Sequence, residues 1–394
     1  MIRFHKAFYA FLRALINPYF RITDYSWEPF RPVSDRYLVL TNHTTNWDFF
    51  LAGLITKKHM YFVCSEHILR NGFTGKLIKF LVNPIPRKKG ARGAEASAEI
   101  VRRLKQGLNV CMMAEGDRTF SGETGTVSPN TAALLRGTDA GLVTIRIHGG
   151  YFLNPRWAPK KRKGPTWGEA VNEYTPEMLA SMTDDEINAA IARDLYVNAY
   201  DDQEIKHAKY TCENPAEHLE TALYICPVCK KLSTLKSHGD TLECTDCGMQ
   251  LTFDEYGYFH SKDGSEPPFT TTLDWDRWQK EEIVKICAEA VNAPDTPLFS
   301  DENVILTLVN GGEASAAPES GSIAMYPDRL EFTGVSGNSH VIKLTDISKF
   351  SLTLTARMLF TISDGKYYEV KPQGVCCARR YMHAWQAITG RTIR

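Results

Sequence analysis

The sequence of 394 residues predicts an α/β protein: a domain with a mainly parallel sheet flanked by helices, then a small cysteine-rich segment and a mainly-β domain. Three observations lead to this fold class. Between residues 36 and 147, strand-like apolar runs alternate with helical patterns, which is typical of a parallel sheet with crossover helices. Four cysteines stand as two pairs between residues 226 and 247. Beyond residue 322, short runs of β-type residues are separated by turns and followed by one helical segment.

Size and charge favour several domains with a basic first part. A chain of this length exceeds what one hydrophobic core usually organises. Hydrophobic residues make up 43% of the chain and charged residues 23%, which argues against a disordered or fibrous protein. The net charge is zero, but residues 1–170 hold 26 Lys and Arg against 12 Asp and Glu, and the remainder holds 20 against 34. We expect the first part to meet anionic lipid, phosphate or an acidic carrier protein; an uneven solvated surface is the alternative.

Residues 1–30 are predicted to form an amphipathic segment at a membrane interface. Apolar residues recur at helical spacing from Phe4 to Tyr19 with basic residues between them, and Pro18 is expected to end the run. An anchor in the headgroup layer and a helix docked on the protein's own core both fit this pattern. We expect no cleavable secretory signal, because Arg3, Lys6 and Arg13 interrupt the apolar stretch and no small-residue cleavage site follows. No apolar run reaches membrane-spanning length. We therefore expect a cytoplasmic protein, bound peripherally to the inner face of the cell membrane.

Residues 31–210 are predicted to form the α/β domain. Its strands are expected at the apolar runs 37–42, 60–64, 109–115 and 142–148. Its helices are expected from about residue 46, near residue 76, over 94–106 and near 131–137. Thr183 and Glu186 have the spacing of a capping box and predict a further helix, which closes the domain near residue 210. In such folds the loops that follow the strands carry the chemistry.

His43 and Asp48 follow the first of these strands, in the segment LTNHTTNWDFF. Ester formation needs a base that takes the proton of the acceptor hydroxyl, and a neutral imidazole suits this near pH 7. A nearby carboxylate can accept the other ring N–H, select the tautomer and stabilise the imidazolium. We predict that His43 is the general base and that Asp48 orients it. The acceptor oxygen then attacks a thioester directly, so that no nucleophilic Ser or Cys is required.

Two further polar blocks follow strands downstream. Arg87 ends the run Ile85-Pro86-Arg87, and Arg118 ends the run Glu115-Gly116-Asp117-Arg118. Arginine can grip a phosphate with two N–H groups and keeps its charge at every relevant pH. At strand ends on the side of His43, the two arginines would orient a glycerol phosphate with its hydroxyl toward the imidazole. As alternatives, they could be surface ion-pair residues, and Glu115 could cap a turn.

The blocks N-H-x4-D, I-P-R and E-G-x-R, in this order, resemble those of the glycerol-phosphate and 1-acylglycerol-3-phosphate (lysophosphatidic acid) acyltransferase family over roughly residues 30–200. The resemblance implies that a fatty acyl chain passes from acyl-CoA or acyl-carrier protein to the hydroxyl of 1-acylglycerol 3-phosphate, with glycerol 3-phosphate or another lysolipid as open alternatives. The family's fourth block, a Val-Pro-type strand, lacks its proline at 143–147, so no donor contacts are assigned there. The implied site comprises catalytic His43 and Asp48 and the phosphate-binding set Arg87, Glu115, Gly116 and Arg118.

The cysteine-rich segment, expected at residues 222–250, has the four-thiolate pattern of a zinc ribbon. Cys226-x2-Cys229 and Cys244-x2-Cys247 are separated by 14 residues. Two knuckles of this spacing let four sulfurs converge on one ion. The bound ion stabilises a segment that is too small to form a hydrophobic core. We expect one structural Zn²⁺; unliganded cysteines and an iron site of rubredoxin type are the alternatives. The other six cysteines are expected to be core or surface thiols.

The remaining chain is predicted as a connecting segment with a helix at 251–300 and a β domain at 301–394. Residues 309–322 are rich in small residues and breakers, and are expected to form a linker or long loop. The strands and the final helix that follow resemble a pleckstrin-homology-like or GRAM-like module.

A second class of function, a nucleic-acid-binding or scaffold protein, is suggested by the ribbon and the basic first part. No aromatic-interleaved basic stripe accompanies the ribbon, and its surroundings are acidic, so we expect no nucleic-acid partner. Basic side chains at Lys88, Lys89, Arg92 and 156–163 could meet lipid headgroups or carrier phosphates, or could simply be solvated.

Overall fold

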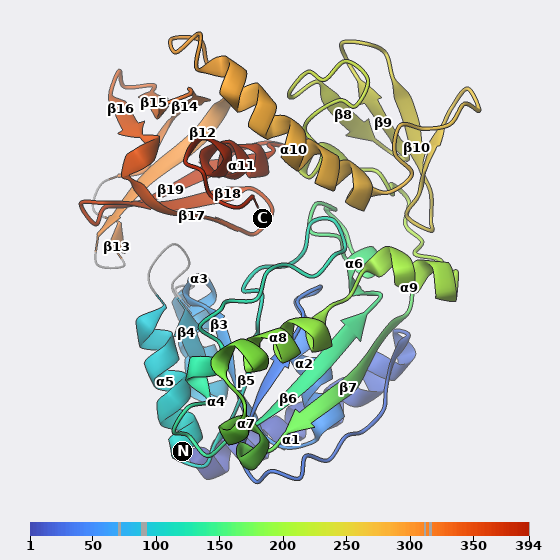
Figure 1. Ribbon diagram of the computed structural model, residues 1–394, viewed down its shortest axis with the longest axis vertical. Coiled ribbons are helices and arrows are strands. Elements are labelled where there is room, and N and C mark those ends of the chain that lie inside the picture. The colour runs from blue at the N-terminus through green and yellow to red at the C-terminus, as the bar shows by residue number, and fades with distance from the viewer. Residues whose placement is uncertain (70–71, 88–92, 311–312, 315–316, 394) are drawn as a thin grey trace. The chain divides into compact units, whose positions relative to one another are not determined.

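A computed structural model describes residues 1–69, 72–87, 93–310, 313–314 and 317–393. The described chain divides into two compact units (Figure 1). The N-terminal unit reaches to Cys212 but does not include Arg156–Pro159, and the C-terminal unit consists of Arg156–Pro159 and Glu213–Arg394. The finer division of the chain into five segments stays a prediction.

A seven-stranded sheet forms the centre of the N-terminal unit, with the strand order β1-β7-β6-β2-β5-β3-β4. From β6 to β4 all neighbouring strands are parallel, whereas β7 runs antiparallel to β6. The predicted mainly parallel sheet is therefore confirmed. The strands are β1 Tyr25–Trp27, β2 Tyr37–Thr41, β3 Met60–Ser65, β4 Ile85–Arg87, β5 Asn109–Met113, β6 Gly141–His148 and β7 Thr166–Tyr174.

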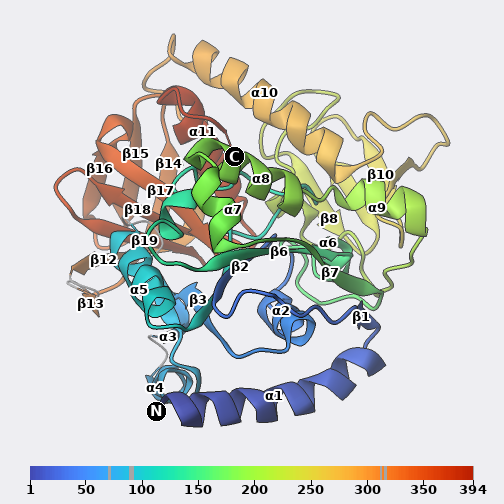
Figure 2. The same cartoon turned by 60° about the horizontal axis from the view of Figure 1, so that its bottom comes forward.

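Helices cover both faces of this sheet (Figure 2). One face carries α1, α2 and α4, and the other carries α5, α7 and α8. A short 3-10 helix, η1 (Ala132–Leu134), stands where the sequence predicted a helix near 131–137. The α-helices are α1 Ile2–Ile22, α2 Asp48–Thr56, α3 Glu66–Leu69, α4 Gly72–Val82, α5 Ala94–Lys105, α6 Gly150–Leu153, α7 Pro176–Ser181, α8 Asp184–Leu195 and α9 Ala199–Lys206.

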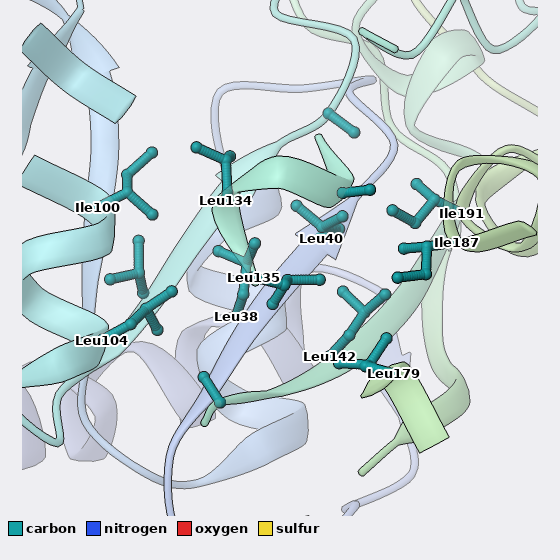
Figure 3. Packing of buried hydrophobic residues seen from close by; sticks show 14 of the residues in the cluster. Leu38, Leu40, Ile100, Leu104, Leu134, Leu135, Leu142, Leu179, Ile187 and Ile191 are labelled. Atoms are coloured by element: carbon teal, nitrogen blue, oxygen red, sulfur yellow. The ribbon is translucent and has the colours of Figure 1, made fainter. Parts of the chain in front are cut away.

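The core beneath α5, η1, α7 and α8 is formed by aliphatic side chains of the central strands (Figure 3). Leu38 and Leu40 of β2 point into this layer, because alternate residues of a strand face the same side. Every residue of β2 is buried. A strand covered on both faces reads as a continuous apolar run, which is why YLVLT was recognisable in the sequence. The helices and turns contribute Ile100, Leu104, Leu134, Leu135, Leu179, Ile187 and Ile191.

Helix α1 continues through Pro18 to Ile22, so the predicted end of the helix at Pro18 is wrong. Proline removes one N–H from the helical ladder, which weakens a helix but does not always stop it. Here the last turn is held by Phe20, which is fully buried and stacks on Tyr25 with ring centroids 4.3 Å apart. No helix among the described residues has both the length and the apolarity needed to cross a membrane.

The C-terminal unit begins with an antiparallel sheet of four short strands in the order β11-β10-β9-β8, followed by the long helix α10 (Thr272–Ala290). A larger antiparallel sheet and the final helix α11 (Ala378–Ile388) complete it. The predicted mainly-β domain is confirmed. The strands are β8 Leu235–His238, β9 Thr241–Cys244, β10 Gln250–Phe253, β11 Phe259–Ser261, β12 Phe299–Asn310, β13 Glu313–Ala314, β14 Glu319–Met325, β15 Arg329–Gly334, β16 Ser339–Lys343, β17 Ile347–Thr353, β18 Arg357–Ile362 and β19 Tyr367–Pro372.

The expected linker at 309–322 is largely part of this sheet. Strand β12 runs on to Asn310, β13 pairs with it, and β14 starts at Glu319; residues 311–312 and 315–316 lie outside the described residues. Small residues suit this place because Gly321 lies across from Gly334 and has the carbonyl of Thr333 close to its Cα. At Gly321 the small residue therefore reflects the close approach of two strands.

Buried polar contacts join the start of the cysteine-rich segment to α10 and α11. Trp275 Nε1 donates to the carbonyl of Ile225 at 3.0 Å, and the Tyr224 hydroxyl lies 2.8 Å from His383 Nδ1. Arg379 of α11 and Asp276 of α10 form an ion pair that is almost completely buried. Burial opposes the charge of Asp276, but the positive charge of Arg379 outweighs it and holds the pKa of that carboxyl well below its usual range. These contacts therefore connect the cysteine-rich segment to both helices within the C-terminal unit.

Candidate active site

The carboxyl ends of the parallel strands bring together residues that are far apart in the sequence. His43 follows β2, Glu115 follows β5, and Arg87 is the last residue of β4. Since parallel strands end at the same edge of a sheet, these positions share one edge. The polar blocks predicted from the sequence therefore meet where an α/β fold places its chemistry.

His43 and Asp48 form a hydrogen-bonded pair. His43 Nδ1 lies 2.9 Å from Asp48 Oδ2, and the histidine side chain is 21% exposed whereas that of Asp48 is 1% exposed. Because Nδ1 is engaged by the carboxylate, Nε2 is the ring nitrogen available to a substrate. The pair has the geometry of a base and its orienting acid.

The Asp48 carboxylate is held by the loop between β2 and α2. It accepts hydrogen bonds from the backbone N–H groups of Thr44, at 2.7 Å, and Thr45, at 2.9 Å. The Thr45 hydroxyl also donates to Oδ1 at 2.6 Å. Asp48 is the first residue of α2, where the helix dipole favours a negative charge. Burial of this charge is thus compensated by donors on several sides, which keeps the carboxylate in one position relative to His43.

Glu115 holds the same loop from the side of β5. Its Oε1 accepts the backbone N–H of His43 at 2.6 Å, and its Oε2 accepts the backbone N–H of Gly125. Burial raises the pKa of Glu115 to about 8, although these two N–H groups act in the opposite direction. Both carboxyl oxygens of Glu115 therefore hold backbone N–H groups in place, and one of these N–H groups belongs to His43, the candidate base.

Arg87 and Gly116 are direct neighbours. Gly116 has a φ of +75°, and a Cβ atom built on it would lie 2.7 Å from Nη1 of Arg87. Among the described residues, Arg87 has no carboxylate within ion-pair distance. The glycine therefore leaves room for a guanidinium beside the loop that carries Glu115.

Arg118 is engaged with backbone carbonyls. Its Nε donates to the carbonyl of Thr44 at 3.0 Å, and its Nη2 donates to the carbonyl of Asn154. Two of the five N–H groups of this guanidinium thus tie the loop after β2 to the end of α6. Arg118 differs in this respect from Arg87, whose guanidinium makes no such bonds among the residues described.

Asn42 was part of the first sequence block but received no role there. Its side chain is buried and bonds the backbone of Ile147 in both directions, each at 2.8 Å. It therefore fastens the end of β2 to the end of β6 directly before His43. An asparagine directly after a buried, mainly apolar strand is the sequence signal that could have indicated this. Tyr151 of α6, which also lines the small hollow beside His43 and Glu115, carried no comparable signal.

The four predicted cysteine ligands converge in the C-terminal unit. The sulfur atoms of Cys226, Cys229, Cys244 and Cys247 all lie within 4.8 Å of one another. The Cys226–Cys247 and Cys229–Cys244 sulfur pairs are each 3.7 Å apart. Zn–S bonds of about 2.3 Å in a tetrahedron place sulfurs about 3.8 Å apart, so these distances fit a four-thiolate zinc site.

Matching turns shape the two cysteine knuckles. The N–H of Lys230 bonds the carbonyl of Cys226 at 2.9 Å, and the N–H of Gly248 bonds the carbonyl of Cys244 at 3.0 Å. Both of these donors have positive φ angles, +59° and +77°. The repeated turn points both sulfurs of each pair inward. With four thiolates and no open position, the cluster suits a structural ion better than a reactive one.

Only some of the basic residues at 156–163 are exposed at the surface. Arg156 and Arg162 are buried, whereas Lys160 and Lys161 are exposed. Lys88, Lys89 and Arg92 lie outside the described residues. The headgroup-binding role suggested for the run 156–163 therefore does not extend to its arginines.

Helices α1 and α4 share an exposed apolar surface. α1 buries His5, Tyr9 and Phe20, but leaves other apolar side chains in solvent. Phe4 of α1 contacts Phe80 of α4, with ring centroids 5.3 Å apart, which joins the two helices. The exposed residues of this surface, here called the α1–α4 surface, are Phe4, Phe11, Leu15, Tyr19, Phe73, Leu77 and Phe80.

Comparison with known proteins gives one family and several solved structures. Residues 21–148 match the family model described as Acyltransferase. No curated protein matches the chain by sequence. Among solved structures, the chain is similar to the 1-acyl-sn-glycerophosphate (LPA) acyltransferase PlsC from Thermotoga maritima, with 19% identity, a TM-score of 0.39, and coverage of 47% of this chain and 73% of that one. It is also similar to the Vps36 N-terminal PH domain, with 16% identity, a TM-score of 0.20, and coverage of 24% and 80%.

Proposed function

We propose that this protein transfers a fatty acyl chain to the hydroxyl of a phosphate-bearing glycerolipid, with His43 as the general base. The match of residues 21–148 to the Acyltransferase family model supports this proposal. The observation that carries the proposal is the buried Asp48 carboxylate 2.9 Å from His43 Nδ1, which leaves Nε2 for the acceptor. The favoured acceptor is 1-acylglycerol 3-phosphate; glycerol 3-phosphate and other lysolipids share the chemistry that the site would recognise.

The reaction needs one proton to move twice. His43 Nε2 takes the proton of the acceptor hydroxyl while the oxygen forms a bond to the thioester carbonyl carbon. The C–S bond then breaks, and the imidazolium returns the proton to the leaving thiolate, which departs as a thiol. Asp48 stabilises the imidazolium between the two transfers. The donor is acyl-CoA or acyl-carrier protein.

Arg87 is the residue we propose to bind the acceptor phosphate. Arg87 lies at the same edge of the sheet as His43, beside Gly116, and its charge has no acidic partner among the described residues. Arg118 and Glu115 support the same site by holding its loops, since both already bond the backbone at Thr44 or His43. Phosphate clamping at Arg87 would fix the hydroxyl relative to the imidazole, which is catalysis by positioning.

The α1–α4 surface is proposed to rest on a membrane. Exposed aromatic and aliphatic residues on neighbouring helices suit burial at the headgroup boundary, and basic residues such as Lys76 and Lys79 suit anionic lipids. A lipid acceptor could then reach the site without leaving the bilayer. One Zn²⁺ on the four cysteines is proposed to stabilise the C-terminal unit.

The test is acyl transfer in vitro. Purified protein is mixed with labelled acyl-CoA or acyl-carrier protein and a panel of acceptors: 1-acylglycerol 3-phosphate, glycerol 3-phosphate and neutral lysolipids. We expect acylation of phosphate-bearing acceptors that is lost in His43→Ala, with the fold of that variant unchanged by circular dichroism. Full activity of His43→Ala would reject the mechanism, and products only from neutral acceptors would reject the phosphate site.

A further inference from the structure

A loop at residues 119–125, here called the site loop, holds the peptide groups of His43. The N–H of Thr119 donates to the carbonyl of His43 at 3.2 Å. The N–H of Gly125 donates to Oε2 of Glu115, and Oε1 of the same carboxylate accepts the N–H of His43 at 2.6 Å. The site loop therefore restrains both peptide groups of His43, the carbonyl directly and the N–H through Glu115.

The site loop is fastened to the chain segment that enters α9. Two hydrogen bonds join Thr124 and Val197: the N–H of Thr124 donates to the carbonyl of Val197, and the N–H of Val197 donates to Oγ1 of Thr124, each at 2.9 Å. The N–H of Ala199, the first residue of α9, donates to the carbonyl of Gly122 at 2.9 Å. A Cβ built on Gly122 would lie 3.1 Å from Cβ of Ala199, so the two segments are in close contact. The position of the site loop thus depends on where α9 begins.

His148, the last residue of β6, holds the first turn of α9. Its Nδ1 lies 2.8 Å from Oδ2 of Asp202, which follows Ala199 by one helical turn. Because an ionised carboxylate only accepts hydrogen bonds, Nδ1 carries the proton. The side chains of His148 and Asp202 are 12% and 19% exposed, so water screens this pair less than it screens a pair on an open surface. The pair therefore fixes α9 to the end of β6.

Neighbouring side chains hold the His148 ring in place. The ring stacks on Trp167 of β7, with centroids 5.2 Å apart and an interplanar angle of 3°. The ammonium group of Lys206, the last residue of α9, lies 5.3 Å from the centroid of the same indole. Nε2 of His148 lies 3.7 Å from Oε1 of Glu169, whose side chain is more than half exposed. Asp202 and Lys206 thus join both ends of α9 to the neighbouring ends of β6 and β7.

The residue before His148 restrains the candidate base from its other side. The backbone of Ile147 exchanges two hydrogen bonds with the side chain of Asn42, each at 2.8 Å, and Asn42 directly precedes His43. The end of β6 is therefore connected to His43 in two ways, through Asn42 and through α9 with the site loop. Removal of the His148 side chain releases the second connection and leaves the first one in place.

We propose that His148 is a positioning residue for acyl transfer: with Asp202 it fixes the start of α9, and through the site loop it fixes the peptide groups of His43. In this role His148 does not touch the substrate. The proposal rests on the proposed function for its activity readout. Its structural content, that the pair restrains the site loop, is measured without any substrate.

The first experiment compares the acyl-transfer kinetics of His148→Ala and His148→Asn with a matched control in the full-length chain. His260→Ala is the control, because His260 of β11 also lies 2.8 Å from an aspartate, Asp254, but belongs to the C-terminal unit. We expect His148→Ala to lower kcat about tenfold and to keep the KM of the acceptor within about twofold, since misplacement of a reacting group costs rate more than binding. Asparagine can place an amide N–H near the position of Nδ1, so His148→Asn should recover part of kcat. His260→Ala should keep the wild-type kcat.

A double-mutant cycle tests whether His148 and Asp202 act as a pair. Asp202→Ala alone should lower kcat by a similar factor. The double variant His148→Ala with Asp202→Ala should be no slower than either single variant, because each substitution removes the same contact. Effects that multiply in the double variant would show independent roles and overturn the pair. If His148→Ala does not fold, Asp202→Ala is judged by the same kinetic and exchange measurements.

Hydrogen–deuterium exchange gives a readout that is independent of activity. Amides of residues 119–125 should exchange faster in His148→Ala than in the wild type, and at the wild-type rate in His260→Ala. An active wild type whose His148→Ala variant keeps its kcat overturns the positioning role and leaves the proposed function standing. A wild type that is inactive with every donor and acceptor defeats the proposed function. Faster exchange of the site loop would then still support its restraint by His148, and unchanged exchange would overturn it.

Discussion

The guanidinium of Arg87 lies against the Cα of Gly116, so closely that a methyl group on the glycine would stand 2.7 Å from Nη1. This contact joins two blocks that are nearly 30 positions apart in the sequence. It also explains why a glycine follows Glu115: the position needs both a left-handed φ of +75° and space for a neighbouring cation. A phosphate clamp at this edge depends on that space.

Gly116→Ala is expected to raise the KM for the phosphate-bearing acceptor about tenfold, because the added methyl displaces Arg87. Gly107→Ala is the matched control: Gly107 also has a φ of +75°, but nothing lies within 4 Å of its Cβ position. Both variants should lose about 1 kcal/mol of stability through backbone strain. Steady-state kinetics separate the two effects. Equal KM values for both variants would contradict the role of Arg87.

Asp48→Asn is expected to lower kcat by about 10²- to 10⁴-fold, since the amide cannot stabilise an imidazolium and selects the wrong tautomer. The variant should also unfold at lower denaturant concentration, because Asp48 accepts bonds from the N–H groups of Thr44 and Thr45. Asp139→Asn serves as control, since that carboxylate is exposed. Acyl-transfer rates and urea titrations measure both effects. An Asn variant with wild-type kcat would exclude the dyad.

Glu115 is expected to make the protein less stable as pH rises from about 5 to 8. Its folded pKa of about 8 lies above its ordinary value of 4.5, so in this window the folded state holds a proton that the unfolded state has lost. The contribution of Glu115 is complete below pH 4.5 and falls as pH increases. Glu115→Gln removes this slope. Urea titrations at several pH values measure the free energy of unfolding of both proteins. If this free energy depends on pH in the same way for both, the raised pKa of Glu115 is contradicted.

Removal of the metal is expected to unfold the C-terminal unit, because the cysteine knuckles anchor a ribbon that shares buried bonds with α10 and α11. Metal analysis of the purified protein should find one zinc per chain. Cys247→Ser should lose it and become sensitive to protease beyond residue 213. Cys212→Ser, outside the cluster, is the control. A protease pattern that is the same with and without zinc would argue against a structural role.

The α1–α4 surface is expected to bind vesicles that contain anionic lipid. The double variant Phe11→Glu with Phe73→Glu places charges on this surface, where the wild-type side chains are 58% and 80% exposed. We expect it to stay in the supernatant when vesicles are sedimented. Val335→Glu alters an equally exposed apolar residue of the C-terminal unit and should sediment like the wild type. Equal sedimentation of all three proteins would remove the membrane proposal.

Local patterns made much of this fold predictable. The buried strand β2 was visible as a continuous apolar run, and the capping box at Thr183 is present with both of its bonds. The strand β7 was missed, because Thr166–Tyr174 mixes small, polar and charged residues that show no clear period. It is stabilised as a strand by pairing with β6 and β1, which are contacts that no local pattern contains.

The sequence by itself indicated the candidate residues: a histidine five positions before an aspartate, arginines after two strands, and cysteines in two spaced pairs. These are properties of residue type and short spacing, and they can be recognised without knowledge of the fold. Only the tertiary structure decided which partner each polar group contacts. Glu115 holds the backbone of His43, Arg118 ties two loops, and Arg379 pairs with Asp276 inside the C-terminal unit. Such partners are chosen by packing between distant segments, and the energy of each contact depends on burial that no single stretch of sequence encodes.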